Sequence, residues 1–238
     1  MVEYTGAIID LDGTVWRGDD LIDGAREGID ALREAGVAVT FVSNGTDIDR
    51  DAFDDRLEEL GLPTDIEVIT AASATAEYLA DEHPDAEAFV MGQQPIAAEL
   101  DAAGISATDV AGTDDADAET TFVATNTDRT HPIGGEEIIP GAGATIGAIQ
   151  GMTGTEPTVV GKPAAQMAET ATESMGVDSA DCLVIGDRLE TDIEMGNNAG
   201  MTTVLVLTGA STEADIDEQG IEPDHVLDSL GEIGEILN

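Results

Sequence analysis

Residues 7–14 read Ala-Ile-Ile-Asp-Leu-Asp-Gly-Thr, a short apolar run followed at once by two carboxylates and a glycine. The run does not alternate with polar residues, so it predicts a strand that is buried on both faces, as in a parallel sheet covered by helices. Ligands of such sheets bind beyond the carboxyl ends of the strands. A plain Asp-Gly turn is the alternative, but this string directly after an apolar strand is much rarer. Asp10 and Asp12 are therefore candidate site residues, and Gly13 permits close approach of the backbone.

Apolar, β-branched runs alternate with amphipathic segments along much of the chain. This alternation predicts an α/β fold with a doubly wound parallel sheet. The expected strands are 7–9, 37–42, 158–160, 182–185, 203–207 and 225–227. The expected helices are 24–35, 48–60, 142–152, 164–175, 191–199 and 230–237.

The alternation loosens from about residue 71 to residue 135. This region contains two helix-like segments, 72–80 and 96–103, and two strand-like segments, 88–91 and 121–124. Residues 109–119 are acidic and rich in small side chains, which predicts a loop. We interpret residues 71–135 as a smaller, inserted α/β domain, and residues 1–70 and 136–238 as the core domain.

The chain is strongly acidic, with 51 Asp and Glu against 8 Lys and Arg and a formal net charge of −43. Self-repulsion of this size destabilises a compact state at low salt, whereas 1 M salt shortens the Debye length to about 3 Å. The composition therefore favours a halophilic protein of a salt-rich cytoplasm. An acidic tail or a cation-binding surface is the alternative, but the acids are spread along the chain. The charge also argues against a nucleic-acid partner.

Cysteine content and hydropathy indicate the compartment. Cys182 is the only cysteine, which excludes an intramolecular disulfide and fits a reducing compartment. It lies in an apolar run, so we expect a buried structural thiol. The N-terminus lacks the basic segment of a signal peptide, and the apolar stretches are far shorter than a membrane span. We expect a cytoplasmic protein without a membrane partner; the sequence leaves open whether it is a homo-oligomer.

Three further apolar runs end in polar clusters like the one after residue 9. These clusters are Ser43-Asn44-Gly45, Gly161-Lys162 and the segment from Asp187 to Asp192. A hydroxyl, an amide and a flexible backbone can hold phosphate oxygens, as at the first cluster. Because the carboxyl ends of parallel strands lie at one edge of a sheet, the four clusters predict one site.

Lys162 is the only lysine of the chain. A leftover surface lysine is the simple interpretation. Its position after an expected strand, in order between the Ser43 and Asp187 clusters, instead favours a role as the cation of the site.

The ordered set Asp10-x-Asp12-Gly-Thr, Ser43-Asn44, Lys162 and Gly-Asp187…Asp192 resembles the haloacid dehalogenase-like superfamily. Longer strings, at 43–45, 124–128, 140–143, 160–163 and 186–193, resemble its NagD-like phosphatase branch. The resemblance covers nearly the whole chain and implies a Rossmann-like core with a C2-type α/β cap between the Ser43 and Lys162 motifs. An acidic segment stands between Val110 and Phe122, where relatives carry a further strand and helix, so we expect a reduced cap.

The resemblance also implies a role for each motif residue. Asp10 would be the nucleophile that forms an aspartyl-phosphate, and Asp12 the general acid and base. Mg²⁺ would be bound at Asp10, the backbone carbonyl of Asp12, and Asp187, with Asp192 orienting a metal-bound water or Lys162. The residues expected to bind the phosphoryl group are Ser43, Asn44, Gly45, Lys162 and Asn126.

These expectations describe a Mg²⁺-dependent phosphomonoesterase of small phosphate esters, such as a sugar phosphate, phosphoglycolate, a nucleotide or p-nitrophenyl phosphate. Two alternatives remain: a phosphoacceptor signalling module and a non-catalytic protein that binds phosphate esters. We expect Trp16, just past Thr14, to be structural, with packing near the leaving group as the alternative.

Overall fold

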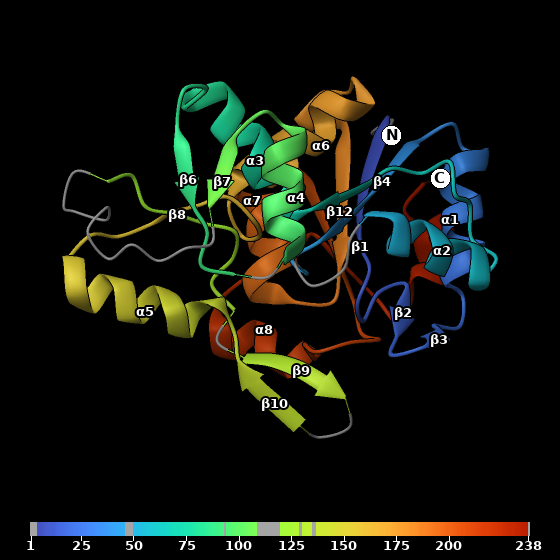
Figure 1. Cartoon of the computed structure of the whole chain (residues 1–238). Coiled ribbons are helices and arrows are strands. Elements are labelled where there is room, and N and C mark those ends of the chain that lie inside the picture. The colour runs from blue at the N-terminus through green and yellow to red at the C-terminus, as the bar shows by residue number, and fades with distance from the viewer. Residues whose placement is uncertain are drawn as a thin grey trace. The chain divides into compact units, whose positions relative to one another are not determined.

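The computed structural model describes residues 4–45, 50–92, 94–108, 120–128, 130–134 and 137–237 (Figure 1). The chain divides into two compact units. The core unit comprises Met1–Ser43, Arg50–Ile69 and Lys162–Asn238, and the inserted unit comprises Asn44–Asp49 and Thr70–Gly161. The division differs from the boundary expected at residue 135, because residues 136–161 belong to the inserted unit.

The core unit is built on a six-stranded sheet of order β14-β13-β12-β1-β4-β5. The strands are β1 (Gly6–Asp10), β4 (Ala38–Ser43), β5 (Val68–Thr70), β12 (Cys182–Gly186), β13 (Thr202–Val206) and β14 (His225–Leu227). β1 pairs in parallel with β4 and β12, and β13 pairs in parallel with β12 and β14. The predicted α/β fold with a parallel sheet is confirmed.

The central strands of this sheet, β1 and β12, are apolar, as is typical of strands that helices cover. Every residue of β1 and β12 is buried. The helices of the core unit are α1 (Ala25–Glu34), α2 (Arg50–Glu59), α6 (Ala165–Met175), α7 (Glu194–Ala199) and α8 (Glu213–Gln219). α6 contacts β1 and β4, and α1 packs against the 3₁₀ helix η3 (Leu230–Glu235). A second 3₁₀ turn, η1 (Ser179–Asp181), precedes β12.

Several parts of the core unit differ from the expected helices and strands, among them α8 and β5, which the pattern did not predict. The expected helix 191–199 begins instead with a π-helical turn, η2 (Leu189–Ile193), followed by α7. The expected helix 230–237 is the 3₁₀ helix η3. A small antiparallel hairpin of β2 (Trp16–Arg17) and β3 (Asp20–Leu21), which the pattern did not predict, follows β1.

The inserted unit combines short strands with helices of 9 to 12 residues. Its helices and strands are α3 (Ala71–Glu82), β6 (Glu87–Phe89), α4 (Gln94–Ala102), β7 (Ser106–Thr108), β8 (Val123–Ala124), β9 (Thr130–Gly134), β10 (Glu137–Pro140), α5 (Ala142–Thr153) and β11 (Thr158–Val159). α3 begins at a capping box between Thr70 and Ser73. A cluster of Ala76, Leu100 and Ile105 forms a small core. The predicted loop 109–119 lies outside the described residues.

The expected strand 158–160 belongs to the inserted unit and not to the central sheet. β11 pairs in parallel with β8, with Thr158 opposite Val123. β6 pairs in parallel with β7, and β9 pairs antiparallel with β10. The chain completes the β8–β11 pair before it returns to the core, which is why the unit boundary lies at residue 161 and not at residue 135.

Two expectations, one about membrane-spanning segments and one about the cysteine, can be compared with the described residues. Among those residues, no helix combines the length and apolar character needed to cross a bilayer. Cys182 is fully buried at the start of β12, and burial raises the pKa of its thiol to about 12. The thiol is therefore structural, as predicted.

Candidate active site

The core unit gathers one lysine and two aspartates at the carboxyl edge of its sheet. Asp10 is the last residue of β1, and Asp192 lies in the turn that follows β12. The Lys162 ammonium donates a short hydrogen bond to Asp10 Oδ1 and another, of 2.7 Å, to Asp192 Oδ1. The side chain of Lys162 is 3% exposed and that of Asp192 is 1% exposed. Lys162 is therefore a buried cation held by two carboxylates and not a leftover surface residue.

Lys162 reaches this place by a route that the sequence did not predict. It was expected at the end of a strand of the central sheet, but β11 is not part of that sheet. Lys162 is instead the first residue of the core unit after the insertion, and α6 begins three residues later. Burial opposes its charge, but Asp10 and Asp192 outweigh that effect and raise the pKa of the ammonium. Lys162 therefore stays protonated.

A third carboxylate, that of Asp187, completes the cluster. One oxygen each of Asp10, Asp187 and Asp192 lies within 4.8 Å of the others, and all three residues are buried. Burial raises the pKa of Asp10 well above its ordinary value, although Lys162 acts in the opposite direction. Burial, and then the charge of Asp192, raises the pKa of Asp187 to about 6. One lysine does not balance three carboxylates, so the cluster calls for a further cation.

Two oxygens of the cluster are available to such a cation. Asp10 Oδ2 and Asp187 Oδ1 are buried and accept no hydrogen bond from the residues that the structure describes. A buried polar atom without a partner is costly unless something else satisfies it. Hard anionic oxygens are the ligands that Mg²⁺ and Ca²⁺ prefer. The donor set thus fits a divalent cation held by Asp10 and Asp187.

Backbone groups hold the acidic side chains in place. Asp187 Oδ2 accepts a hydrogen bond of 2.5 Å from the N–H of Ala210, and its carbonyl accepts one of 3.0 Å from the N–H of Ser211. Asp192 Oδ2 accepts one of 3.1 Å from the N–H of Arg188. The last of these bonds joins Arg188, the residue before the π-helical turn η2, to Asp192 within it; π-helical turns are often found at functional sites. The orientation of both carboxylates is therefore fixed by main-chain donors.

The loop 208–211 is a part of the site that the sequence analysis missed. Besides Ala210 and Ser211, which bind Asp187, it contributes Thr208, whose Oγ1 donates to the carbonyl of Gly13 at 2.7 Å. A signal was present, because Thr-Gly-Ala-Ser follows the apolar strand β13 as the predicted clusters follow theirs. Its residues are common in ordinary turns, and nothing local indicates that they contact Asp187.

Glycines let the backbone approach these carboxylates. A Cβ at Gly13, whose φ is +100°, would lie 2.5 Å from Asp187 Oδ2. A Cβ at Gly209 would overlap the side chain of Asp187, and a Cβ at Gly186 would overlap that of Asp192. Gly13 is thus required for two reasons: its φ is positive, and a side chain at this position would overlap Asp187.

Asp12 differs from the buried acids because it is exposed. It follows β1 by two residues, and its Oδ1 accepts a hydrogen bond of 2.9 Å from the indole N–H of Trp16. Trp16 itself is 2% exposed. The expectation of a structural Trp16 is therefore incomplete, because its polar atom binds a candidate site residue.

The predicted phosphate-binding residues fall into both units. Ser43 is the buried last residue of β4 in the core unit. Asn44 and Gly45 belong to the inserted unit, as does Asn126. Asn126 is 5% exposed, and its Nδ2 donates to the carbonyl of Asn44 at 3.1 Å. The inserted unit thus brings Asn44 and Asn126 together, while the role of these residues in phosphate binding stays a prediction.

Comparison with known proteins identifies the family. The model of haloacid dehalogenase-like hydrolases matches residues 7–106, and a model described as HAD-hydrolase-like matches residues 159–233. The sugar-phosphatase AraL of Bacillus subtilis is 36% identical over 255 residues, which cover 98% of this chain and 93% of that protein.

Solved structures agree with this result over nearly the whole chain. The p-nitrophenyl phosphatase from Archaeoglobus fulgidus has a TM-score of 0.86 at 34% identity and covers 98% of this chain and 99% of its own. NagD from E. coli K-12 has a TM-score of 0.84 at 28% identity, with 97% and 98% covered. The motifs at 10–14, 43–45, 162 and 187–192 had predicted this similarity, and the chain belongs to the NagD-like branch of the haloacid dehalogenase-like hydrolases.

Proposed function

We propose that this chain, a phosphomonoesterase of the haloacid dehalogenase-like family, hydrolyses small phosphate esters, sugar phosphates among them, with Mg²⁺ as its cofactor. The observation that carries the proposal is the buried carboxylate of Asp10. One of its oxygens is held by Lys162, and the other accepts no hydrogen bond from the described residues. The 36% identity to a sugar phosphatase supports the substrate class.

In the first step, an oxygen of Asp10 attacks phosphorus and the bond from phosphorus to the leaving oxygen breaks, which gives an aspartyl-phosphate. Asp12 donates a proton to the leaving oxygen. The Lys162 ammonium, 2.7 Å from Asp192 and in contact with Asp10, offsets the negative charge that the phosphoryl group brings. Ser43, Asn44, Gly45 and Asn126 are proposed to bind its oxygens.

In the second step, water attacks phosphorus of the aspartyl-phosphate while Asp12 accepts a proton from that water. Inorganic phosphate leaves and the Asp10 carboxylate is restored. Mg²⁺ would be held by Asp10, Asp187 and the carbonyl of Asp12, with Asp192 ordering its surroundings, and would supply positive charge against the phosphate oxygens. The inserted unit is proposed as the cap that selects the leaving group.

The test is a substrate panel of sugar phosphates, phosphoglycolate, nucleotides and p-nitrophenyl phosphate, assayed at high salt with Mg²⁺ or with EDTA. We expect Mg²⁺-dependent release of phosphate, with sugar phosphates among the best substrates. A phosphorylated Asp10 that persists without turnover would favour a signalling module. Tight binding without turnover would favour a binding protein.

The charge of the cluster predicts how Mg²⁺ affects stability at different pH values. In the metal-free protein the raised pKa of Asp187, about 6, makes its ionisation unfavourable. The stability that the protonated group provides is therefore lost as the pH rises through about 6. Mg²⁺ should raise Tm clearly at about pH 8 and much less at about pH 5. Equal shifts at both pH values, or an unchanged shift in Asp187→Asn, would contradict the metal site.

The acidic composition predicts a dependence of stability on salt, as expected for a protein of a salt-rich cytoplasm. The carboxylates of a chain with net charge −43 repel one another less as the KCl concentration rises, because the Debye length falls from about 10 Å at 0.1 M to about 3 Å at 1 M. We expect Tm to rise by about 5 °C or more over this range, which corresponds to about 2 kcal/mol. Sorbitol at matched osmolality is the control, and a gain of equal size in sorbitol would contradict charge screening as the cause.

A further inference from the structure

The hydrogen bond between Trp16 and Asp12 has no role in the mechanism described above. It joins the indole Nε1 to Asp12 Oδ1 at 2.9 Å. We propose that Trp16 is a positioning residue that fixes the Asp12 carboxyl group for proton transfer to the leaving oxygen. This inference rests on the proposed role of Asp12 as general acid.

The chemistry of an indole determines which oxygen of Asp12 carries the proton. An indole N–H donates and cannot accept, so the oxygen that it binds acts as an acceptor. Oδ1 is that oxygen, and the proton of the acid form is left to Oδ2. The two oxygens are equivalent in a free carboxylate, but the hydrogen bond from Trp16 makes Oδ1 the acceptor and Oδ2 the oxygen that carries the proton.

Two side chains of α2 hold the indole in place. The ring of Phe53 stacks against it with the ring centroids 6.5 Å apart. The guanidinium carbon of Arg56 lies 4.8 Å from the centre of the indole ring, in cation–π geometry. Phe53 is 2% exposed, like Trp16, so the indole has little freedom to move.

Arg56 also binds the hairpin that carries Trp16. Its Nη2 donates a short hydrogen bond to the carbonyl of Gly18, in the turn between β2 and β3, and its Nη1 lies 3.9 Å from Asp19 Oδ1. The backbone of Trp16 is tied to the motif itself, because its carbonyl accepts from Gly13 at 2.8 Å and its N–H donates to Leu11 at 3.1 Å. Main chain and side chain together set where the indole N–H points.

Fixing Asp12 matters because the residue is exposed. An exposed carboxyl group samples several rotamers, and ordering it costs conformational entropy. A general acid that is already oriented before the substrate binds avoids this cost at the moment of reaction. A buried tryptophan needs a partner for its N–H in any case, but here the partner is the group that would transfer the proton.

The test uses leaving groups that differ in their need for a proton. Trp16→Phe removes the N–H and keeps an aromatic face for Phe53 and Arg56. We expect kcat/KM for an alkyl phosphate, such as glycerol phosphate, to fall about tenfold or more. For p-nitrophenyl phosphate, whose phenolate leaves without a proton, kcat/KM should fall by no more than about twofold. A merely structural role would lower both values equally, and that result would overturn the proposal.

Three further variants provide the controls. Leu32→Ala removes a fully buried side chain of α1 and leaves the side chains of Trp16, Phe53 and Arg56 unchanged, so it should lower Tm without changing the ratio of the two kcat/KM values. Arg56→Gln should change this ratio in the same direction as Trp16→Phe. If Trp16→Phe does not fold, Arg56→Gln tests the positioning role in its place. An unchanged ratio in Arg56→Gln would then overturn the proposal. Asp12→Asn should change the ratio most. Combining Trp16→Phe with Asp12→Asn should leave the ratio as it is in Asp12→Asn alone.

The Asp12→Asn result separates the two levels of the argument. If Asp12→Asn leaves the ratio unchanged, the role of Asp12 as general acid is wrong and the proposal for Trp16 is overturned with it. If Asp12→Asn changes the ratio and Trp16→Phe does not, only the positioning role of Trp16 is overturned.

Discussion

Asp10→Asn is expected to lower turnover by on the order of 10³-fold or more, because an amide cannot attack phosphorus as a carboxylate does. The fold should survive the change. Asp10 is buried at the end of β1, where burial raises its pKa, so a neutral side chain of the same size removes an unfavourable charge. The measurement is the rate of phosphate release from p-nitrophenyl phosphate, together with Tm.

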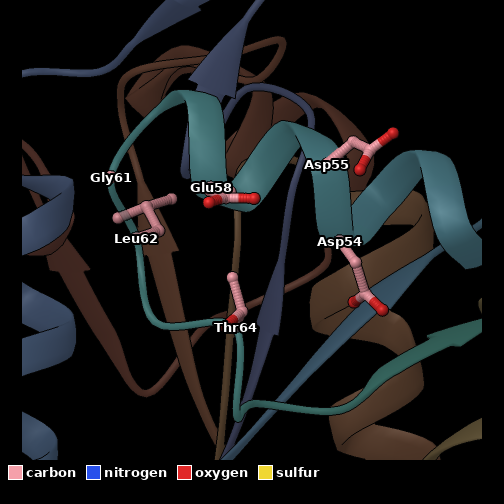
Figure 2. Close-up of a pocket in the computed structure, with 6 residues that line it drawn as sticks. All are labelled: Asp54, Asp55, Glu58, Gly61, Leu62 and Thr64. Atoms are coloured by element: carbon pink, nitrogen blue, oxygen red, sulfur yellow. The ribbon is translucent and has the colours of Figure 1, made fainter.

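A matched control for Asp10→Asn is available on α2. Asp54 is exposed and lines an acidic pocket with Asp55, Glu58, Gly61, Leu62 and Thr64 (Figure 2), which includes none of the site residues. Asp54→Asn makes the same chemical change and should keep full activity. Wild-type turnover in Asp10→Asn would contradict the assignment of the nucleophile.

Lys162→Arg is expected to lower kcat/KM by about 10²-fold or more. A guanidinium is a wide planar fork, whereas the Lys162 ammonium is a compact charge that donates to both Asp10 and Asp192 from a side chain 3% exposed. The charge is kept, so a loss of activity reports the geometry of the ammonium.

Lys162→Met tests the charge itself. It keeps an unbranched side chain but leaves Asp10 and Asp192 buried without their cation, and breaking a buried ion pair in this way costs about 3–5 kcal/mol. We expect a large fall in Tm at neutral pH and a smaller one in acid, where the carboxyls take up protons. Arg33→Met serves as the control, because its ion pair with Asp65 is exposed and screened by solvent, so its loss should change Tm little. Near-normal activity in Lys162→Arg would show that the ammonium has no special role.

The sequence predicted the parts of the fold that depend on local pattern. The apolar runs that became β1, β12 and β13 are long enough to be recognised, and each ends beside a polar cluster. Asp10 and Asp187 were found for this reason. The glycine after Asp12 was found too, although its second role, to leave room for Asp187, depends on a contact across the fold.

The remaining features depend on tertiary contacts. β11 looks like a strand of the central sheet because two β-branched residues have the same pattern whether they pair with β8 or with the sheet. β5 and β7 have three residues each, which is too short for a periodic signal. The π-helical turn η2 widens a segment whose composition is that of an ordinary helix, and the Arg188–Asp192 hydrogen bond spans it. The pairing of β11, the short strands β5 and β7 and the π-helical turn therefore leave no signal in the local sequence.

The central claim is that Asp10 becomes phosphorylated during turnover, and the most direct measurement is mass spectrometry of acid-quenched Asp12→Asn after mixing with p-nitrophenyl phosphate and Mg²⁺. This leaving group needs no proton, so the first step should proceed, while loss of the general base should slow hydrolysis of the intermediate. The account predicts a hydroxylamine-labile phosphate, near one per chain, on the peptide that contains Asp10. Turnover by this variant without any phosphorylated Asp10 would contradict it.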